Sequence, residues 1–259
     1  MRDDDTNDYQ VATLLQQVQL KRPTYYDERK RIANTVDKYS EIKQQILIIY
    51  RDSHETYGYR RISKVLEVNH KMHVSETKLL ELMAEVGIHN TLYNAHTTKY
   101  SSFKGDKKTS PNILRGQFVA KIPFTVLHTD ITQVKLLNGK FGYISSIMDE
   151  ATREVIGMVV SDSPNKALVQ ATLDEAQSKL PEGATPIMHS DHGWHYQTPD
   201  YRGYLQANNY TISMSRKGNC LDNAPMESFF HLLKVESLNR HKYHNLDELR
   251  TAVDQYTEW

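Results

Sequence analysis

Three acidic residues are placed so that they could act together. Asp130 and Asp191 each stand where an expected strand gives way to a loop, and Glu227 falls in the first turn of an expected helix. Converging carboxylates repel one another unless cations lie between them. Hard oxygen ligands suit Mg²⁺ or Mn²⁺, and two such ions about 3.5–4 Å apart can clamp the attacking and leaving oxygens of a phosphodiester. The three residues therefore predict phosphoryl transfer on nucleic acid.

Each acid, taken singly, also has a structural explanation. Asp191 could cap a turn, Asp130 could end a strand, and Glu227 could interact with the dipole of its helix. Two further acids near these positions, Asp149 and Asp222, are interpreted as a turn residue at a strand end and as a helix cap. The residue types alone leave both explanations open, so the surrounding elements matter.

The second half of the chain has the pattern of a mixed sheet. Three strands joined by short turns are antiparallel neighbours, and the later strands are separated by amphipathic helices, which makes them parallel crossovers. The order is that of the ribonuclease H-like fold, in which the first and fourth of five strands are adjacent. The expected strands are 124–132, 141–149, 154–160, 186–190 and 210–213, and the expected helices are 165–180, 198–208 and about 223–238.

The first part of the chain has helical periodicity instead. Helices are expected over 9–19, 27–39, 41–51, from residue 58, and after an N-cap at Ser75, with a break over 21–26. Short helices in close order are typical of a helix-turn-helix-like region, in which Arg60 and Arg61 would suit phosphate contacts. A small helical domain with a solvated basic face fits the periodicity equally well.

Charge is unevenly distributed although the net charge is zero. Residues 97–121 hold six Lys and Arg against one Asp, with several Gly, Ser and Pro, which disfavours regular structure. The predicted organisation is a helical DNA-binding region over 1–96, a basic linker over 97–121 and a catalytic core over 122–259. The linker could equally be a merely soluble loop.

Composition excludes several classes of protein. The longest aliphatic run has four residues, far below the roughly 20 that a membrane span needs, and the acidic N-terminus does not fit a secretory signal. We therefore expect a cytoplasmic, nucleoid-associated protein without a membrane partner. The single Cys220 excludes disulfides within the chain and zinc sites that need two thiolates.

Four sequence words resemble a known family. They are 128–132 (HTDIT), 189–197 (HSDHGWHYQ), 213–219 (SMSRKGN) and 222–230 (DNAPMESFF). The chain resembles the DDE transposases of bacterial two-frame insertion sequences, in particular the second-frame (OrfB) product, whose core is similar to retroviral integrase. The 35 residues between Asp191 and Glu227, and Lys234 seven residues after the Glu, match the family pattern, as does the word 57–62 (YGYRRI). The resemblance covers roughly residues 10–259.

The resemblance implies a catalytic mechanism. Asp130, Asp191 and Glu227 would ligate two Mg²⁺ ions, with Mn²⁺ as a substitute, that activate water or a DNA 3′-OH. No covalent enzyme intermediate is expected. Lys234 would reach a DNA phosphate beside the metals, because seven residues place it two turns from Glu227 on the same helix face.

Further DNA-binding candidates carry competing explanations. Asn223 could orient a carboxylate or a nucleotide, and a helix N-cap role explains it equally well. Arg216 and Lys217 could hold a DNA strand or only solubilise a loop. His192 and His195 border Asp191 and could contact DNA or pack locally.

The resemblance also implies partners and an alternative. The partners would be the terminal inverted repeats of the element and target DNA, a first-frame protein or a frameshift fusion, and further copies of the chain on DNA. Relatives continue past Trp259 with a Tyr-Asn-x-x-Arg-x-His-like segment and a helix, so a C-terminally truncated core is expected. There are two alternatives to a transposase catalytic subunit. One is a catalytically silent DNA-binding remnant that modulates transposition, and the other is a nuclease of RNA–DNA hybrids.

Overall fold

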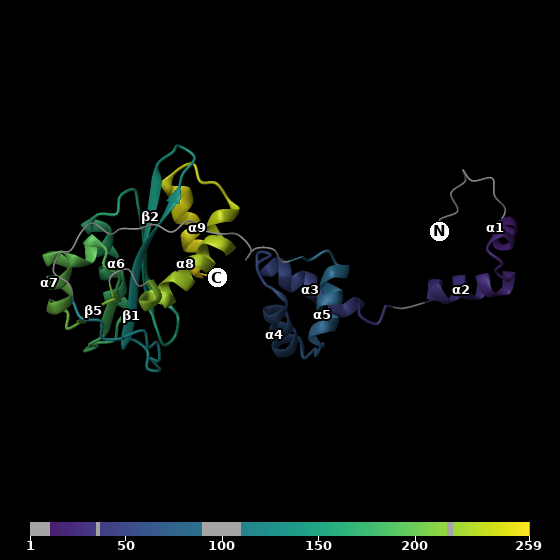
Figure 1. Ribbon diagram of the computed structural model, residues 1–259, viewed down its shortest axis with the longest axis horizontal. Helices are drawn as coiled ribbons and strands as arrows, with labels where there is room; N and C mark the ends of the chain where they lie inside the picture. The colour runs from purple at the N-terminus through teal and green to yellow at the C-terminus, as the bar shows by residue number, and fades with distance from the viewer. Residues whose placement is uncertain (1–10, 35–36, 90–109, 217–219, 259) are drawn as a thin grey trace. The chain divides into compact units, whose positions relative to one another are not determined.

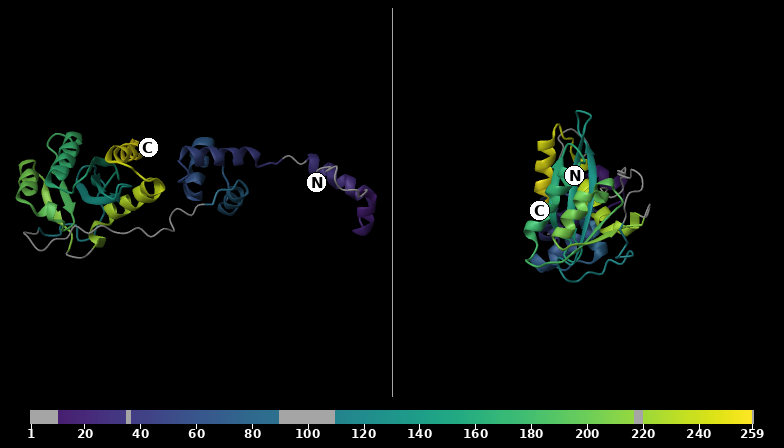
Figure 2. Two further views of the ribbon diagram at one scale, coloured as in Figure 1. Left: turned by 90° about the horizontal axis from the view of Figure 1, so that it is seen from above. Right: turned by 90° about the vertical axis from the view of Figure 1, so that its left-hand side faces the viewer.

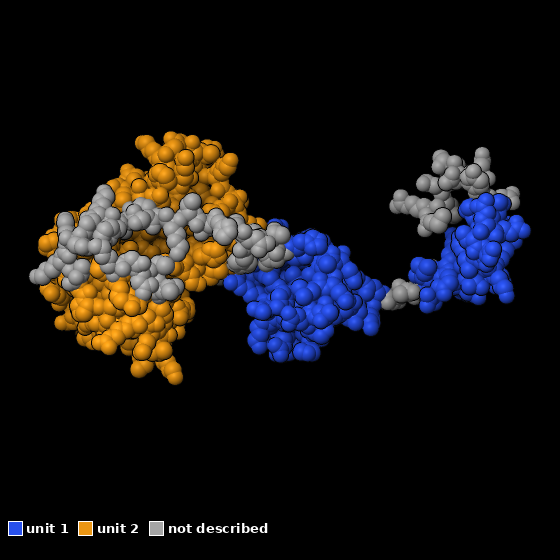
Figure 3. Space-filling view, in the orientation of Figure 1, with its two compact units in different colours: residues 1–90 blue, residues 91–259 orange. Residues whose placement is uncertain are grey.

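The computed structural model describes residues 11–34, 37–89, 110–216 and 220–258. The chain divides into two compact units, residues 1–90 and residues 91–259 (Figures 1 and 3). The first unit is helical and the second contains the sheet. Within the described ranges, no helix combines the length and the hydropathy that a membrane crossing requires.

Helices alone make up the regular structure of the first unit in its described part. Three of them enclose one apolar core, to which Ile46, Ile62 and Leu79 contribute fully buried side chains. The spacing of apolar residues on each helix places them on one face, as expected from periodicity. The helices are α1 (Val11–Gln17), α2 (Arg22–Asn34), α3 (Ser40–Asp52), α4 (Tyr59–His70) and α5 (Glu76–Glu85).

The expected break over residues 21–26 is wrong, because α2 begins at Arg22 and includes Pro23. Proline is tolerated in the first turn of a helix, where its missing N–H has no helical partner in any case. Ser75 precedes α5 as expected, although its side chain makes no capping hydrogen bond. Gly87 follows α5 with a φ of +79°, which ends the helix as glycine commonly does.

The second unit is built on a mixed five-stranded sheet with the order β3-β2-β1-β4-β5. The pairs β1–β2 and β2–β3 are antiparallel, while β1–β4 and β4–β5 are parallel. This arrangement confirms the expected ribonuclease H-like topology. The strands are β1 (Val126–Lys135), β2 (Phe141–Asp149), β3 (Val155–Ser161), β4 (Ile187–Ser190) and β5 (Thr211–Met214).

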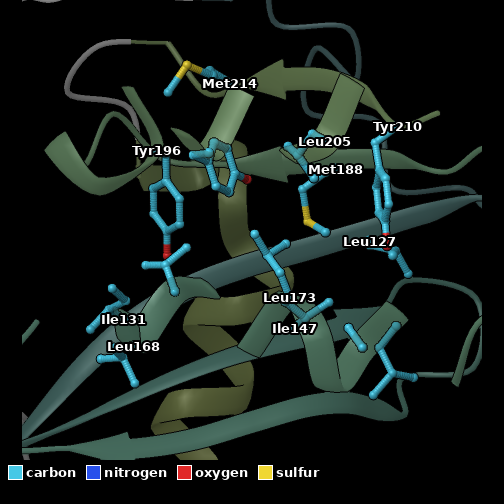
Figure 4. Close-up of a cluster of buried hydrophobic side chains, with 14 residues drawn as sticks. Leu127, Ile131, Ile147, Leu168, Leu173, Met188, Tyr196, Leu205, Tyr210 and Met214 are labelled. Atoms are coloured by element: carbon cyan, nitrogen blue, oxygen red, sulfur yellow. The ribbon is translucent and has the colours of Figure 1, made fainter. Parts of the chain in front are cut away.

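Helices cover both faces of this sheet (Figures 1 and 2). One face packs against α6 (Lys166–Lys179) and α7 (Pro199–Ala207) through a cluster that includes Leu127, Ile147 and Leu173 (Figure 4). The other face packs against α8 (Ala224–Glu236) and α9 (Leu246–Glu258) through a second apolar cluster. Since side chains alternate along a strand, the even-numbered residues of β1 and β2 face α8.

Helix α9 was not expected from the sequence. Its apolar residues Leu249, Val253 and Tyr256 recur at helical spacing and join the cluster beneath α8. Gly142 of β2 makes room for it, because a Cβ there would lie 2.4 Å from the Leu249 Cδ2 atom. The closing helix of the unit therefore belongs to the core and covers the sheet beyond α8.

The end of the predicted linker is packed onto the second unit. Asn112 Nδ2 donates to the Asp222 carboxylate (2.8 Å), and the Ile113 N–H donates to Ser213 Oγ (3.0 Å). Farther along, the Ala120 N–H donates to Glu150 Oε1 (2.8 Å). Residues 110–121 thus make specific hydrogen bonds, and most of the remaining predicted linker lies outside the described residues.

Candidate active site at the start of helix α8

The same three-residue pattern, His-x-Asp, occurs on two adjacent parallel strands. In the β1–β4 ladder, His128 pairs with His189. Asp130 and Asp191 each lie two residues farther along the chain, so both follow this pair by the same step. Residues two apart in a strand share a face, and neighbouring strands lie about 4.8 Å apart. Asp191 directly follows the last residue of β4, so the two aspartates lie at the same end of the two strands, where the charge of Asp191 acts on Asp130.

Glu227 approaches from α8, whose start is attached to β1. Asn223, immediately before the helix, donates from Nδ2 to the Thr129 carbonyl (3.2 Å), and its Oδ1 lies 3.0 Å from His128 Nδ1. Thr129 is the neighbour of Asp130, and Glu227 lies one helical turn after Asn223. Asn223 thus holds the beginning of α8 against β1 at Thr129, the residue next to Asp130.

A buried polar network supports this attachment. His128 is fully buried, and its two ring nitrogens face oxygen acceptors, Asn223 Oδ1 and Glu150 Oε2, the latter at 2.8 Å. Burial raises the pKa of Glu150, but hydrogen bonds from His128 and from the Ala120 N–H outweigh it and hold this pKa below its usual range. The charged Glu150 carboxylate therefore binds the His128 ring at Nε2, while Asn223, at the start of α8, binds it at Nδ1.

Electrostatics link the three predicted catalytic acids and Lys234. Burial, and then the charge of Asp191, raise the pKa of Asp130 well above its usual value, and Glu227 adds to this effect. The Ile131 N–H, which donates to Asp130 Oδ1 (2.7 Å), and Lys234 act in the opposite direction. Two acids and one lysine thus influence the carboxyl group of Asp130.

Asp191 has its own local support. Burial raises the pKa of its carboxyl group, whereas the Gly193 N–H, which donates to Asp191 Oδ1 (2.7 Å), lowers it. Across the part of the chain that the structure describes, no three His, Cys, Asp or Glu side chains are grouped closely enough to hold a metal ion as they stand. The carboxylates of Asp130, Asp191 and Glu227 therefore interact electrostatically without forming a ready-made metal site.

Comparison with known proteins identifies the family. Residues 120–220 and 208–259 match models of the integrase core domain, and residues 38–94 match an HTH-like domain. The chain is 35% identical to InsK of insertion sequence element IS150 from Escherichia coli K12, a protein named as a transposase, over 97% of this chain and 87% of InsK. The chain belongs to the insertion-sequence transposase family.

Other relatives agree with this assignment. The protein named as the transposase of IS1353 from Shigella flexneri is 34% identical over 97% of this chain, which spans 48% of that protein. The 31 kDa protein of IS600 from Shigella sonnei is 32% identical over 84% of this chain and 79% of that protein. The resemblance drawn from the four sequence words is therefore confirmed, and the transposase has the domain types of a DNA-binding polynucleotidyl transferase.

The basic candidates of the transposase lie in different surroundings. Lys234 is half-buried on α8, and burial lowers its pKa while Asp130 raises it. Arg60 and Arg61 are exposed on α4 and lie over the rings of Tyr59 (5.5 Å) and Tyr57 (5.3 Å). The two arginines belong to the helical unit and the lysine to the sheet unit.

Two candidates make contacts that the sequence did not predict. Asn223 is buried and bonded to β1 and to His128, and although it stands at the N-cap position of α8 its side chain makes no capping hydrogen bond. Asn223 and not Asp222 occupies the N-cap position of α8, and Asp222 accepts hydrogen bonds from Arg216 Nε (3.0 Å) and NH2 (2.9 Å). The exposed Arg216 is therefore held against its own loop, and Lys217 lies outside the described residues.

The two histidines after Asp191 pack locally. His192 Nε2 donates to the Ser215 carbonyl, and His195 Nε2 donates to the Pro164 carbonyl (2.7 Å). Sequence reasoning missed the network formed by His128 and Glu150. The available signal was the His-x-Asp pattern, which begins at His128 and again at His189. Two identical patterns on paired strands indicate that the corresponding residues take equivalent positions in the sheet.

Proposed function

We propose that this chain is the catalytic subunit of an insertion-sequence transposase, and that Asp130, Asp191 and Glu227 carry out its chemistry. The observation that supports this most strongly is the equal offset of the two aspartates from the His128–His189 pair, together with the hydrogen bond that ties Asn223, one helical turn before Glu227, to the Thr129 carbonyl. A structural role for any one acid would not require both Asp191 and Glu227 to influence the Asp130 carboxyl group.

The donor set fits magnesium. Three carboxylates supply only hard oxygen ligands. Burial and, after it, the charges of Asp191 and Glu227 raise the pKa of Asp130, and a divalent cation would relieve this crowding of negative charge. Asp130, Asp191 and Glu227 would hold two Mg²⁺ ions, or Mn²⁺ in their place. When bound, these ions would activate the attacking oxygen and stabilise the leaving oxygen of a phosphodiester.

Two reactions would occur at this site. In hydrolysis, a water oxygen forms a bond to phosphorus, the bond to the DNA 3′-oxygen breaks, and that oxygen leaves as a 3′-OH. In joining, this 3′-OH attacks a phosphate of target DNA and displaces the 3′-oxygen of the target strand. Asn223 and His128 would keep α8 at a fixed distance from β1 during both reactions, and Lys234 would neutralise a phosphate.

The remaining functions belong to the rest of the chain and to partners. Arg60 and Arg61 would contact the phosphates of the terminal inverted repeats, and Arg216 with Lys217 would line the DNA path. Several copies would assemble on the two element ends and target DNA, together with a first-frame protein or as a frameshift fusion. The protein would work on nucleoid DNA.

Nicking of supercoiled plasmid by the full chain in Mg²⁺ and in Mn²⁺ tests this proposal. The variants Asp191→Asn and Glu227→Gln should lose nicking, whereas Asp200→Asn should keep it, because Asp200 lies on α7 and pairs with Lys166 (2.6 Å). Folded wild-type protein that does not nick DNA in either metal would support the catalytically silent alternative. Equal activity of all four proteins would exclude the three acids as the catalytic groups.

A further inference from the structure

A buried hydroxyl lies directly across the sheet from Asp130. Ser146 of β2 is the ladder partner of Asp130, and opposite residues in an antiparallel pair have Cβ atoms about 4.5–5.5 Å apart on the same face. The neighbouring residues Ile144 and Met148, two positions away on either side, both belong to the apolar cluster beneath α8. Ser146 therefore faces the same space as the predicted catalytic acids.

This hydroxyl has no partner in the fold. Ser146 is fully buried, and its Oγ atom makes no hydrogen bond among the described residues. A buried hydroxyl without a partner costs free energy, since it has lost water and gained nothing in exchange. An alanine or valine at this position would suit a purely structural strand, so the serine needs another explanation.

The adjacent residue provides a comparison within the same strand. Ser145 is also fully buried and its Oγ also makes no hydrogen bond among the described residues. Its side chain points to the opposite face, toward the cluster beneath α6 that includes Ile147. The two serines share residue type, strand and burial, and differ in whether they face Asp130.

We propose that Ser146 is a positioning residue for Asp130, whose hydroxyl donates a hydrogen bond to the Asp130 carboxylate when that carboxylate holds a metal ion. The proposal rests on the proposed function, because it needs Asp130 to be a metal ligand. A carboxylate has more acceptor positions than one metal ion occupies, and Asp130 Oδ1 already accepts the Ile131 N–H on one side. A second donor from β2 would fix its rotation, as hydrogen bonds to metal ligands generally do.

The test compares Ser146→Ala with Ser145→Ala in the full chain. In EDTA, both variants should melt at or above the temperature of the wild type, because each loses a buried hydroxyl that had no partner. Mn²⁺ is then titrated while the melting temperature is recorded. Ser146→Ala should need about ten-fold to 100-fold more Mn²⁺ for half of the maximal shift, the usual effect of removing a group that supports a metal ligand.

Ser145→Ala should keep the wild-type Mn²⁺ concentration, and the metal dependence of plasmid nicking should move in the same way as the melting data. Equal Mn²⁺ responses of Ser146→Ala and Ser145→Ala, with the wild type responding, would overturn the role of Ser146 and leave the proposed function standing. A wild type that neither responds to Mn²⁺ nor nicks DNA would overturn the proposed function, and the role of Ser146 with it.

Discussion

His128 of β1 and Asn223 at the start of α8 are joined by a hydrogen bond of 3.0 Å between Nδ1 and Oδ1. Both side chains are buried, and Asn223 also donates to the Thr129 carbonyl. This contact connects the strand that carries Asp130 with the helix that carries Glu227. The separation of those two acids therefore depends on a contact between two buried side chains.

Replacing Asn223 with alanine should reduce both stability and catalysis. The change leaves His128 Nδ1 and the Thr129 carbonyl buried without partners, which costs about 1–3 kcal/mol for each unsatisfied group. Urea unfolding measures the loss of free energy, and plasmid nicking per folded molecule measures the loss of activity. We expect nicking to fall even where the protein remains fully folded.

Asn165→Ala is the matched control for that variant. Asn165 caps α6 by accepting the Leu168 N–H (2.9 Å), on the face of the sheet away from the acids. Its loss should cost about 0.5–2 kcal/mol and leave nicking per folded molecule unchanged. A similar loss of nicking in both variants would show that Asn223 acts only through overall stability.

Much of this architecture could be predicted from the sequence. The β-branched and aromatic residues of 141–149, between short turns, predicted β2 at its observed bounds, and the strand order followed from the lengths of the connections. Helix α9 was missed although the sequence carries its signals: Leu249 and Val253 have helical spacing, and Asn245 caps the helix by accepting the Glu248 N–H (2.9 Å). Pro23 was interpreted as a helix breaker, whereas it occupies the first turn of α2.

The candidate site was predictable only in part. The residue types and spacing of Asp130, Asp191 and Glu227 single them out, and their equivalent positions follow from the strand pairing. The roles of Asn223 and Ser146 could not be read from sequence. Both depend on which side chain lies opposite across the sheet or between helix and strand, and residue type does not determine this.

Asp130→Asn should affect stability differently with and without metal. Asp130 is half-buried and crowded by Asp191 and Glu227, so its charge opposes folding of the metal-free protein. In EDTA at neutral pH the variant should melt at or above the wild-type temperature. In Mg²⁺ the wild type should gain melting temperature and the variant should gain less. A variant that is less stable in EDTA would contradict this electrostatic interpretation.

Lys234→Gln should weaken DNA binding in a salt-dependent way. A contact to one phosphate contributes about 0.9 to the slope of the logarithm of the binding constant against the logarithm of salt concentration. Binding of a DNA duplex, followed by fluorescence anisotropy at several salt concentrations, should show a slope smaller by about that amount. Lys179→Gln is the control, because Lys179 is exposed on α6 and pairs with Glu175 (3.1 Å). Equal slopes for both variants would exclude the phosphate contact.

The Arg216–Asp222 pair should give the sheet unit a pH-dependent stability. Hydrogen bonds from Arg216, against a smaller opposing effect of burial, lower the pKa of Asp222 to about 2. A lowered pKa contributes stability above the ordinary pKa of about 3.9, which is lost as the pH falls toward 2. Asp222→Asn should therefore be less stable than the wild type at pH 5, and the difference should shrink between pH 4 and pH 2. Urea unfolding across this range measures it, and a constant difference would contradict the assignment.

Gly157→Ala tests the packing of α6 on the sheet. A Cβ at Gly157 of β3 would lie 2.6 Å from the Thr172 carbonyl oxygen, which the helix backbone holds in place. We expect a loss of about 1–3 kcal/mol in the free energy of unfolding. At Gly203 of α7 nothing lies within 4 Å of the new Cβ, so Gly203→Ala should be neutral or stabilising by up to about 1 kcal/mol. Equal effects of the two changes would mean that β3 and α6 are not in close contact.

The most direct test is to count the metal ions that the three acids hold. Electron paramagnetic resonance of Mn²⁺ measures free and bound metal in the full chain without any dependence on DNA sequence. The wild type should bind two ions, and Asp130→Asn, Asp191→Asn and Glu227→Gln should each need at least ten-fold more Mn²⁺ for half saturation, whereas Asp200→Asn should match the wild type. Identical binding curves for all five proteins would contradict a shared metal site at the start of α8.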